Sequence, residues 1–352
     1  MNLTPVERIA EAVLYEGYML YPYRPSAVKN QQRWNFGVLY PPAFCAKQTG
    51  SESSFMQTEC LVNAARDTRL TVKIRFLQIV QRSIGRLRIP GREAPDGVEP
   101  DLEIVDRLEV RGRTYQPWQE AVEREHTYSA IDPHARAAFS TKELRYPSGK
   151  TFEYLRDDQG LAIGVIVREW QELKGAVEMT AKYMGVGVFR LTVRVENRTP
   201  PPPQASNRTA ARDAIFLHSL VSAHTILGAE HGEFVSMLEP PRGYGILISM
   251  CNNIGTWPVL AGDGAQAVLS SPIILYDHPQ IAPESAGNLF DSTEIDEILS
   301  LRILTLTEDE KREMRDSDDR AREILERTEN MPPEQLMKLH GVLRGLTSVK
   351  GD

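Results

Sequence analysis

Apolar and polar residues alternate along much of the chain between residues 55 and 200. Val72, Ile74 and Phe76 share one face of this pattern, whereas Lys73 and Arg75 take the other, as in a strand that is buried on one side. Antiparallel strands commonly keep one face toward solvent, so the pattern predicts a mainly antiparallel sheet. The expected strands cover residues 55–62, 70–80, 102–110, 151–155, 161–169, 176–183 and 188–197.

The first residues predict a short helix before these strands begin. Thr4 and Glu7 have the spacing of a capping box, in which each residue satisfies a free backbone N–H of the first turn. Gly17 can end the helix that they start. A second short helix is expected within residues 116–140.

Two further helices are predicted near the C-terminus. Thr307 and Glu310 form another capping box, ahead of a charged helix from about residue 308 to 329. Pro332 and Pro333 open a last helix, which Gly345 can end. Together the two helices predict a helical hairpin.

The segment before the C-terminal helices contains further apolar runs. Residues 215–238 are interpreted as two strands around a turn at 228–232, with a helix over 213–223 as the competing interpretation. Within 245–299, two strand-like runs are separated by an Ala-Gly-Asp-Gly turn. The expected fold class is α+β, with a mainly antiparallel β-sandwich-like core, an N-terminal helix and a C-terminal helical hairpin.

A proline-rich stretch suggests a division of the chain. Residues 199–212 read TPPPPQASNRTAAR, and four successive prolines cannot join the interior of a helix or sheet. We therefore expect a β-rich domain over 1–199, a linker or loop over 200–212, and an α+β domain ending in acidic helices over 213–352.

Polar residues cluster where each of the two apolar runs in 245–299 ends. Loops held by a rigid scaffold commonly carry functional sites, so we take these clusters as a candidate ligand or partner site. It comprises His224, Cys251, Asn252, Asn253, Trp257, Asp277, His278 and Glu284. A site in which His224, Cys251, Asp277 and His278 come together in space is the sharpest form of this hypothesis.

Each of these residues also has a structural interpretation. His224 lies in an apolar run, where a core histidine bonded to the backbone is the competing interpretation. Cys251 acts as a nucleophile only with a base beside it and a lowered thiol pKa; otherwise it is a buried cysteine at a strand end. No metal-binding, nucleotide-binding or hydrolase motif is complete. The sequence therefore implies no cofactor or metal, and an enzyme is the less favoured class.

An aromatic and basic segment follows the first helix. Five of the chain's 12 tyrosines lie between residues 15 and 40. Rings packed across a sheet are the structural interpretation, and a contact surface for a peptide or an anionic ligand is the functional one. The residues proposed for this surface are Tyr21, Tyr23, Arg24, Arg33 and Trp34.

Composition and charge narrow the class of protein. The 352 residues are 41% hydrophobic and 25% charged, as is usual for a soluble globular protein. No apolar run is long enough for a membrane span, and three cysteines without a CxxC pair favour a reducing, cytoplasmic location. Residues 284–352 hold 17 Asp/Glu and 10 Lys/Arg, a net charge that disfavours nucleic acid and suits a basic protein surface.

Three stretches of the chain resemble a known family. They read LYEGYMLYPYRPSAVKNQQRWNFGVLYP, TWPVLAG and SSPIILYDHPQIAPES, the last continuing as DSTEIDEILSLRILTLTEDEK. They are similar to a bacterial family of uncharacterised proteins encoded near nickel–iron uptake hydrogenases, especially those of the actinobacterial type. The resemblance covers most of the chain and implies an accessory role in hydrogenase assembly or maturation. It transfers no catalytic residue, and the chain lacks the Met-Cys start of the small hydrogenase chaperones.

The leading hypothesis is therefore an accessory or scaffold protein that acts through protein–protein contacts. A hydrogenase subunit is the expected partner, and a homo-oligomer stays open. The alternative is a metal- or small-ligand-binding protein, or a cofactor-independent hydrolase or isomerase, with its site around Cys251, His224, Asp277 and His278.

Overall fold

The computed structural model describes residues 3–15, 36–95, 97–135, 140–202, 213–280, 303–317, 319–330 and 332. Contacts between Cα atoms divide the chain into two units. The first unit consists of residues 1–18 and 34–280, and the second of residues 19–33 and 281–352. Each unit is described separately below.

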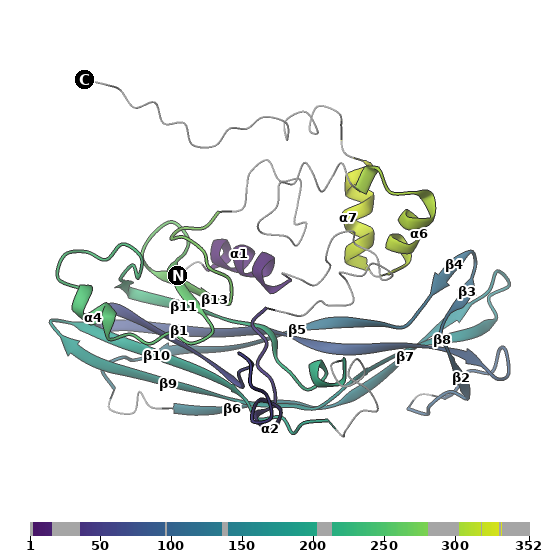
Figure 1. Ribbon diagram of the computed structural model, residues 1–352, viewed down its shortest axis with the longest axis horizontal. Helices are drawn as coiled ribbons and strands as arrows, with labels where there is room; N and C mark the ends of the chain where they lie inside the picture. Colours follow the sequence, from purple (N-terminus) through teal and green to yellow (C-terminus); the bar gives the residue numbers. More distant parts are fainter. Residues whose placement is uncertain are drawn as a thin grey trace. The chain divides into compact units, whose positions relative to one another are not determined.

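One antiparallel sheet of 11 strands dominates the first unit (Figure 1). Every pairing between its named strands is antiparallel, which confirms the predicted fold class. Its strands are β1 (Phe55–Leu87), β2 (Leu102–Val105), β5 (Trp118–Ile131), β6 (Ser140–Tyr146), β7 (Gly149–Arg156), β8 (Ala162–Trp170), β9 (Leu173–Gly185), β10 (Val188–Asn197), β11 (Val221–Phe234), β12 (Trp257–Leu260) and β13 (Ala267–Ser271). A separate hairpin joins β3 (Leu108–Val110) and β4 (Arg113–Tyr115).

The long strand β1 organises the sheet. Its 33 residues pair in turn with β10, β5 and β2 along one edge and with β11 and β8 along the other. The two strands predicted over 55–62 and 70–80 are therefore one strand. The polar residues between them form a bulge, in which the Ala65 N–H donates to Thr68 Oγ1 (2.8 Å), so the chain bends without reversing.

The core lies on the inner side of this bent sheet. Figure 1 shows β11, β1, β10, β9 and β6 following one another across the sheet, in the order of their pairing, and apolar side chains from these strands form one cluster. Met56, Cys60 and Val62 of β1 belong to this cluster, as do Val72 and Phe76 farther along the strand. The inward residues are those that the alternating pattern predicts for the buried face.

Helix α1 (Thr4–Leu14) covers part of the outer side of the sheet. Its residues Val6, Ala10 and Val13 pack on Ile226 of β11 and Leu269 of β13. The helix itself confirms the prediction, but the capping box is wrong, because the residue at the N-cap position is Leu3, whose side chain does not cap the helix.

The carboxylate of Glu7 is instead used in tertiary contacts. It forms an ion pair with Lys73 (2.6 Å), which also contacts Glu125 (3.0 Å). A tertiary ion pair thus replaces the predicted local hydrogen bond at the start of α1.

Three other sequence-based assignments differ from the structure. Residues 116–140 were expected to hold a helix, yet β5 pairs with β1 over almost its full length, so tertiary pairing overrides its helix-forming composition. Residues 215–238 contain one strand, β11, rather than two, because Gly228 is paired within the sheet. A helical turn at 213–216 precedes this strand. The run that begins at Gly245 is helix α4 (Gly245–Ser249), not a strand. Another short helix, α2 (Pro42–Cys45), precedes β1.

The sheet also runs across the predicted linker. Strand β10 ends before the prolines and β11 begins after them, yet both pair with β1. Residues 203–212 lie outside the described residues. The Ala-Gly-Asp-Gly turn lies between β12 and β13 as predicted.

The described part of the second unit includes the helices α6 (Glu308–Ser317) and α7 (Asp319–Glu329). These helices replace the single helix expected over 308–329, and they pack against each other. The capping box is confirmed, since the Thr307 N–H donates to Glu310 Oε2 (2.9 Å). The helix expected after Pro333 lies outside the described residues.

The helices of the chain also bear on the membrane prediction. In the part of the chain that the structure describes, none is both long and apolar enough to cross a bilayer.

Candidate functional site

The first polar cluster of the predicted site is fastened to the sheet by Glu59 of β1. This buried carboxylate accepts hydrogen bonds from the Asn252 N–H (2.8 Å) and from Thr192 Oγ1 of β10 (2.8 Å). Arg190 of β10 lies 3.7 Å from the same carboxylate and donates to the carbonyl of Met250 (2.8 Å). The Glu59 carboxylate and the Arg190 guanidinium therefore both hold the segment that follows α4, each through a hydrogen bond to its backbone.

Asn253 completes this attachment through its side-chain amide. Its Oδ1 accepts from the Glu59 N–H (2.7 Å), and its Nδ2 donates to the Glu59 carbonyl (3.1 Å). The side-chain amide thus makes the two hydrogen bonds that a neighbouring strand residue would make with the Glu59 backbone. An antiparallel bridge between Gln57 and Ile254 continues the pairing. We call the contacts of Glu59 with Asn252, Asn253 and Arg190 the Glu59 latch.

Cys251 is not activated as a nucleophile. Burial raises the pKa of its thiol to about 11, and the Glu59 carboxylate adds to this rise. The thiol Sγ lies 3.7 Å from the Leu247 carbonyl, toward which it can donate. Burial also raises the pKa of Cys60. Since the thiolate is the reactive form, both cysteines are unreactive at neutral pH.

The second polar cluster is fastened to the free edge of β12. Asp277 Oδ1 accepts from the Leu260 N–H (2.8 Å), and Asp277 Oδ2 accepts from Ser236 Oγ (2.5 Å). The His278 N–H donates to the Leu260 carbonyl (2.7 Å), and His278 Nδ1 bonds to the Gly262 carbonyl (2.9 Å). We call these contacts the Asp277 latch.

The Asp277 latch also protects an edge of the sheet. Within the described residues β12 pairs only with β13, and an open edge can recruit other chains. Asp277 and His278 already bond to the N–H and the carbonyl of Leu260, so neither group can pair with another strand. Pro258 has no backbone N–H that another strand could bind. Edge protection is therefore one structural role of this polar cluster.

Replacing Asp277 by alanine is expected to destabilise the protein by about 1–2 kcal/mol, because the Leu260 N–H loses its acceptor. Opening the β12 edge should also promote aggregation on heating. Urea unfolding and light scattering measure the two effects. Asp263→Ala, a change in the neighbouring turn, is the control and should leave both unchanged; an unaltered Asp277→Ala protein would contradict the role of the latch.

His224 is a fully buried core residue on the outer side of β11. Its Nδ1 donates to the Ser222 carbonyl (2.9 Å), because a carbonyl can only accept. Nε2 therefore carries a lone pair, and it has no hydrogen-bond partner in the structure as described. Burial lowers the pKa of His224 to about 4; the Ser222 carbonyl opposes the shift and the Arg75 guanidinium adds to it.

The structure does not assemble the sharpest form of the predicted site. His224 bonds to Ser222, Cys251 contacts Leu247, and Asp277 and His278 contact β12 and its turn. Among the described residues, no group of three or more His, Cys, Asp and Glu side chains could hold a metal. These four residues therefore do not come together as a metal-binding group in the described part of the chain.

The remaining predicted residues are either exposed or outside the described part of the chain. Trp257 begins β12, and its relative exposure is 44%. The other residues lie in ranges that the structure does not describe: Tyr21, Tyr23, Arg24, Arg33, Trp34 and Glu284.

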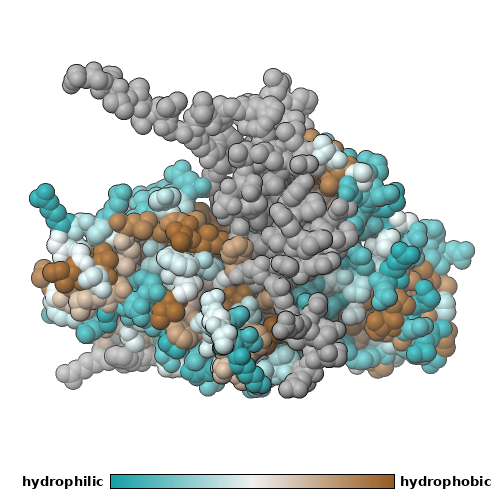
Figure 2. All heavy atoms as spheres, viewed as in Figure 1, coloured by the Kyte–Doolittle hydropathy of each residue, from teal (hydrophilic) through white to brown (hydrophobic). Residues whose placement is uncertain are grey.

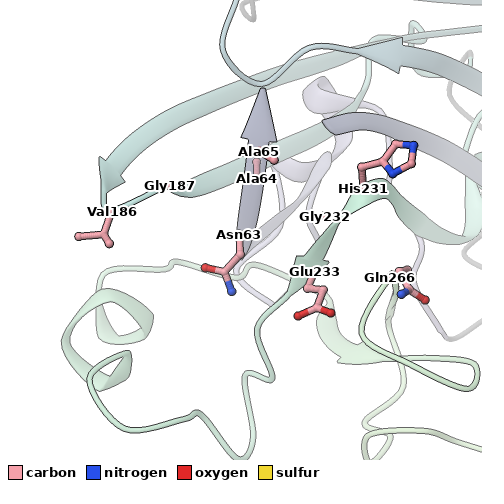
Figure 3. A pocket seen from close by; sticks show the side chains of 9 residues that line it. All are labelled: Asn63, Ala64, Ala65, Val186, Gly187, His231, Gly232, Glu233 and Gln266. Carbon is pink, nitrogen blue, oxygen red and sulfur yellow. The ribbon is translucent and has the colours of Figure 1, made fainter. Parts of the chain in front are cut away.

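A cavity of about 610 Å³ opens where β1, β11 and the β9–β10 turn meet (Figure 3). Its lining residues are Asn63, Ala64, Ala65, Val186, Gly187, His231, Gly232, Glu233 and Gln266. Figure 3 shows Asn63 and Glu233 directed toward the same side, whereas Val186 points away from them. Asn63 Oδ1 accepts from the Tyr244 hydroxyl (2.8 Å), which ties this cavity to the chain leading into α4. No sequence motif marks these residues, because they come from strand ends far apart in the chain.

Sequence reasoning also missed the residues that fasten the predicted clusters. Glu59, Arg190 and Ser236 lie on or next to strands distant from their partners. A carboxylate within the apolar run FMQTECLV was the one available indication, since buried carboxylates need partners.

Comparisons with protein-family models, curated proteins and solved structures found no match for this chain.

Proposed function

We propose that this chain is an accessory or scaffold protein that acts through protein–protein contacts in the assembly or maturation of a nickel–iron hydrogenase. The proposal rests on two short segments with exposed apolar side chains, each of which is fixed in place by one latch. Exposed apolar side chains are common anchors of protein interfaces.

The Glu59 latch follows directly on α4. Ile246 and Met250 of this segment are 78% and 47% exposed. They are four residues apart and so share one helical face. Leu247 and Cys251, one position later, face inward and pack on Leu61.

The Asp277 latch follows a second exposed segment. Ile274 and Tyr276 are 72% and 87% exposed, while Ile273 and Leu275 between them pack on the cluster beneath α1. Alternate residues thus anchor the segment and point outward. A loop that is already fixed loses little conformational entropy on binding, which favours affinity.

The hydrogenase is proposed as the partner on the family resemblance of the sequence. The test is capture of purified hydrogenase large or small subunit by the immobilised full chain, followed by titration of the captured subunit. Tyr276→Asp and Ile274→Asp should each weaken binding about tenfold or more, because a charge replaces an apolar anchor.

Val98→Asp is the matched control. Val98 is also exposed, at 53%, but it precedes β2, in a part of the sheet that neither latch contacts. It should bind as the unchanged chain does. Failure to capture either subunit would overturn the proposed partner, and equal loss with Val98→Asp would overturn the proposed surface.

A further inference from the structure

The surface around α4 combines exposed apolar side chains with three cations, two of which form no ion pair among the described residues. Its apolar part consists of Ile246 and Met250, supported by a cluster that includes Leu61, Val188 and Val235. Figure 2 shows apolar residues at the end of the sheet that carries α4 in Figure 1. We call α4 and the adjoining end of β9 and β10 the α4 surface.

Three cations belong to the α4 surface. Lys182 of β9 lies directly opposite Arg190 of β10 in the register, so both side chains point to the same face of the sheet. Arg190 donates to the Met250 carbonyl at the end of α4. Arg242 lies three residues before the start of the helix.

The two segments that form this surface contain no acidic residue. Residues 180–192 and 240–251 include Lys182, Arg190 and Arg242 but no Asp or Glu. Glu59, the carboxylate beneath them, is buried and already engaged by Arg190, Thr192 and Asn252.

Nearby acids do not neutralise the two exposed cations. Within the described residues, Lys182 and Arg242 form no ion pair with Glu239, Glu233 or any other carboxylate. An apolar centre flanked by unpaired cations complements an apolar segment flanked by carboxylates.

We propose that the α4 surface binds a segment of a protein partner in which apolar side chains are flanked by Asp or Glu. This inference rests on the proposed function and adds the chemistry of the partner's docking segment. Ile246 and Met250 supply the apolar contact, while Lys182 and Arg242 select the acidic flanks and exclude basic ones.

The test uses two labelled amphipathic peptides with the same leucine face. One carries glutamate flanks and the other lysine flanks, and fluorescence anisotropy measures their binding to the full chain. The glutamate peptide should bind about tenfold more tightly or better, and added salt should weaken its binding, because the cations are exposed. Ile246→Asp should abolish binding, whereas Val98→Asp should leave it unchanged.

A double charge reversal makes the test sharper. Lys182→Glu with Arg242→Glu should transfer the preference to the lysine peptide, since both positions are exposed and the core is untouched. Equal binding of both peptides, or of neither, would overturn the inference. A dimer of the unchanged chain that Ile246→Asp dissociates would also overturn it, because a second copy would then occupy the surface. These outcomes involve no hydrogenase, so they are independent of subunit capture.

Discussion

Replacing Glu59 by alanine is expected to lower the free energy of unfolding by about 3 kcal/mol and to expose Cys251 to thiol reagents. The buried carboxylate holds the Asn252 N–H and Thr192 Oγ1 at 2.8 Å each, and Arg190 lies 3.7 Å away. Its removal leaves the Asn252 N–H without its acceptor and the Arg190 guanidinium without the carboxylate beside it. The thiol pKa should also fall from its raised value, because burial and Glu59 are the causes of that rise.

Urea unfolding and the rate of reaction with a disulfide reagent measure the two effects of Glu59→Ala. Glu59→Gln should cost less, because the amide oxygen still accepts from Thr192. Glu196→Ala is the control: Glu196 pairs with Arg198 at the surface (3.0 Å), and such pairs contribute about 0–1 kcal/mol. An unchanged Cys251 reaction rate in a destabilised Glu59→Ala protein would mean that the latch does not hold this segment.

Acidification is expected to destabilise the protein through His224. The folded pKa is about 4 against an ordinary value of 6.5, so between these values the unfolded chain binds more protons than the folded one. Stability therefore falls as the pH drops from about 6.5 to about 4. The loss is on the order of 3 kcal/mol, since each pKa unit corresponds to about 1.4 kcal/mol.

His224→Asn isolates this effect from the carboxylates that titrate in the same range. Asparagine can keep a donor to the Ser222 carbonyl but takes up no proton. The difference in unfolding free energy between the two proteins, measured from pH 7 to pH 4, should shift by about 3 kcal/mol in favour of the variant. A constant difference would show that His224 does not titrate on unfolding.

The alternating pattern predicted the antiparallel sheet and most of its strands, because burial of one face leaves a period of two in the sequence. It did not predict the continuity of β1. Residues 63–69 look like a turn, and only pairing with distant β10 and β11 keeps the strand continuous. The strand predicted from Gly245 was wrong for a different reason. The apolar residues of α4 suit a strand, but a helical turn lets Leu247 and Cys251 pack inward together.

Sequence reasoning located the polar clusters of the site but not what they do. Cys251–Asn253 and Asp277–His278 are marked in the sequence as polar residues that directly follow apolar runs. Their partners, Glu59 and Leu260, are fixed by tertiary structure, which one sequence does not reveal. The chemistry expected of Cys251 depends on burial, which spacing alone cannot provide.

We propose that the latched segments form the contact surface for a hydrogenase subunit. Hydrogen–deuterium exchange of the full chain, with and without the purified subunits, tests it most directly. Slower exchange is expected in residues 245–251 and 272–276 when the partner is present, with β2 and β3 unchanged. Unaltered exchange in both latched segments would contradict it.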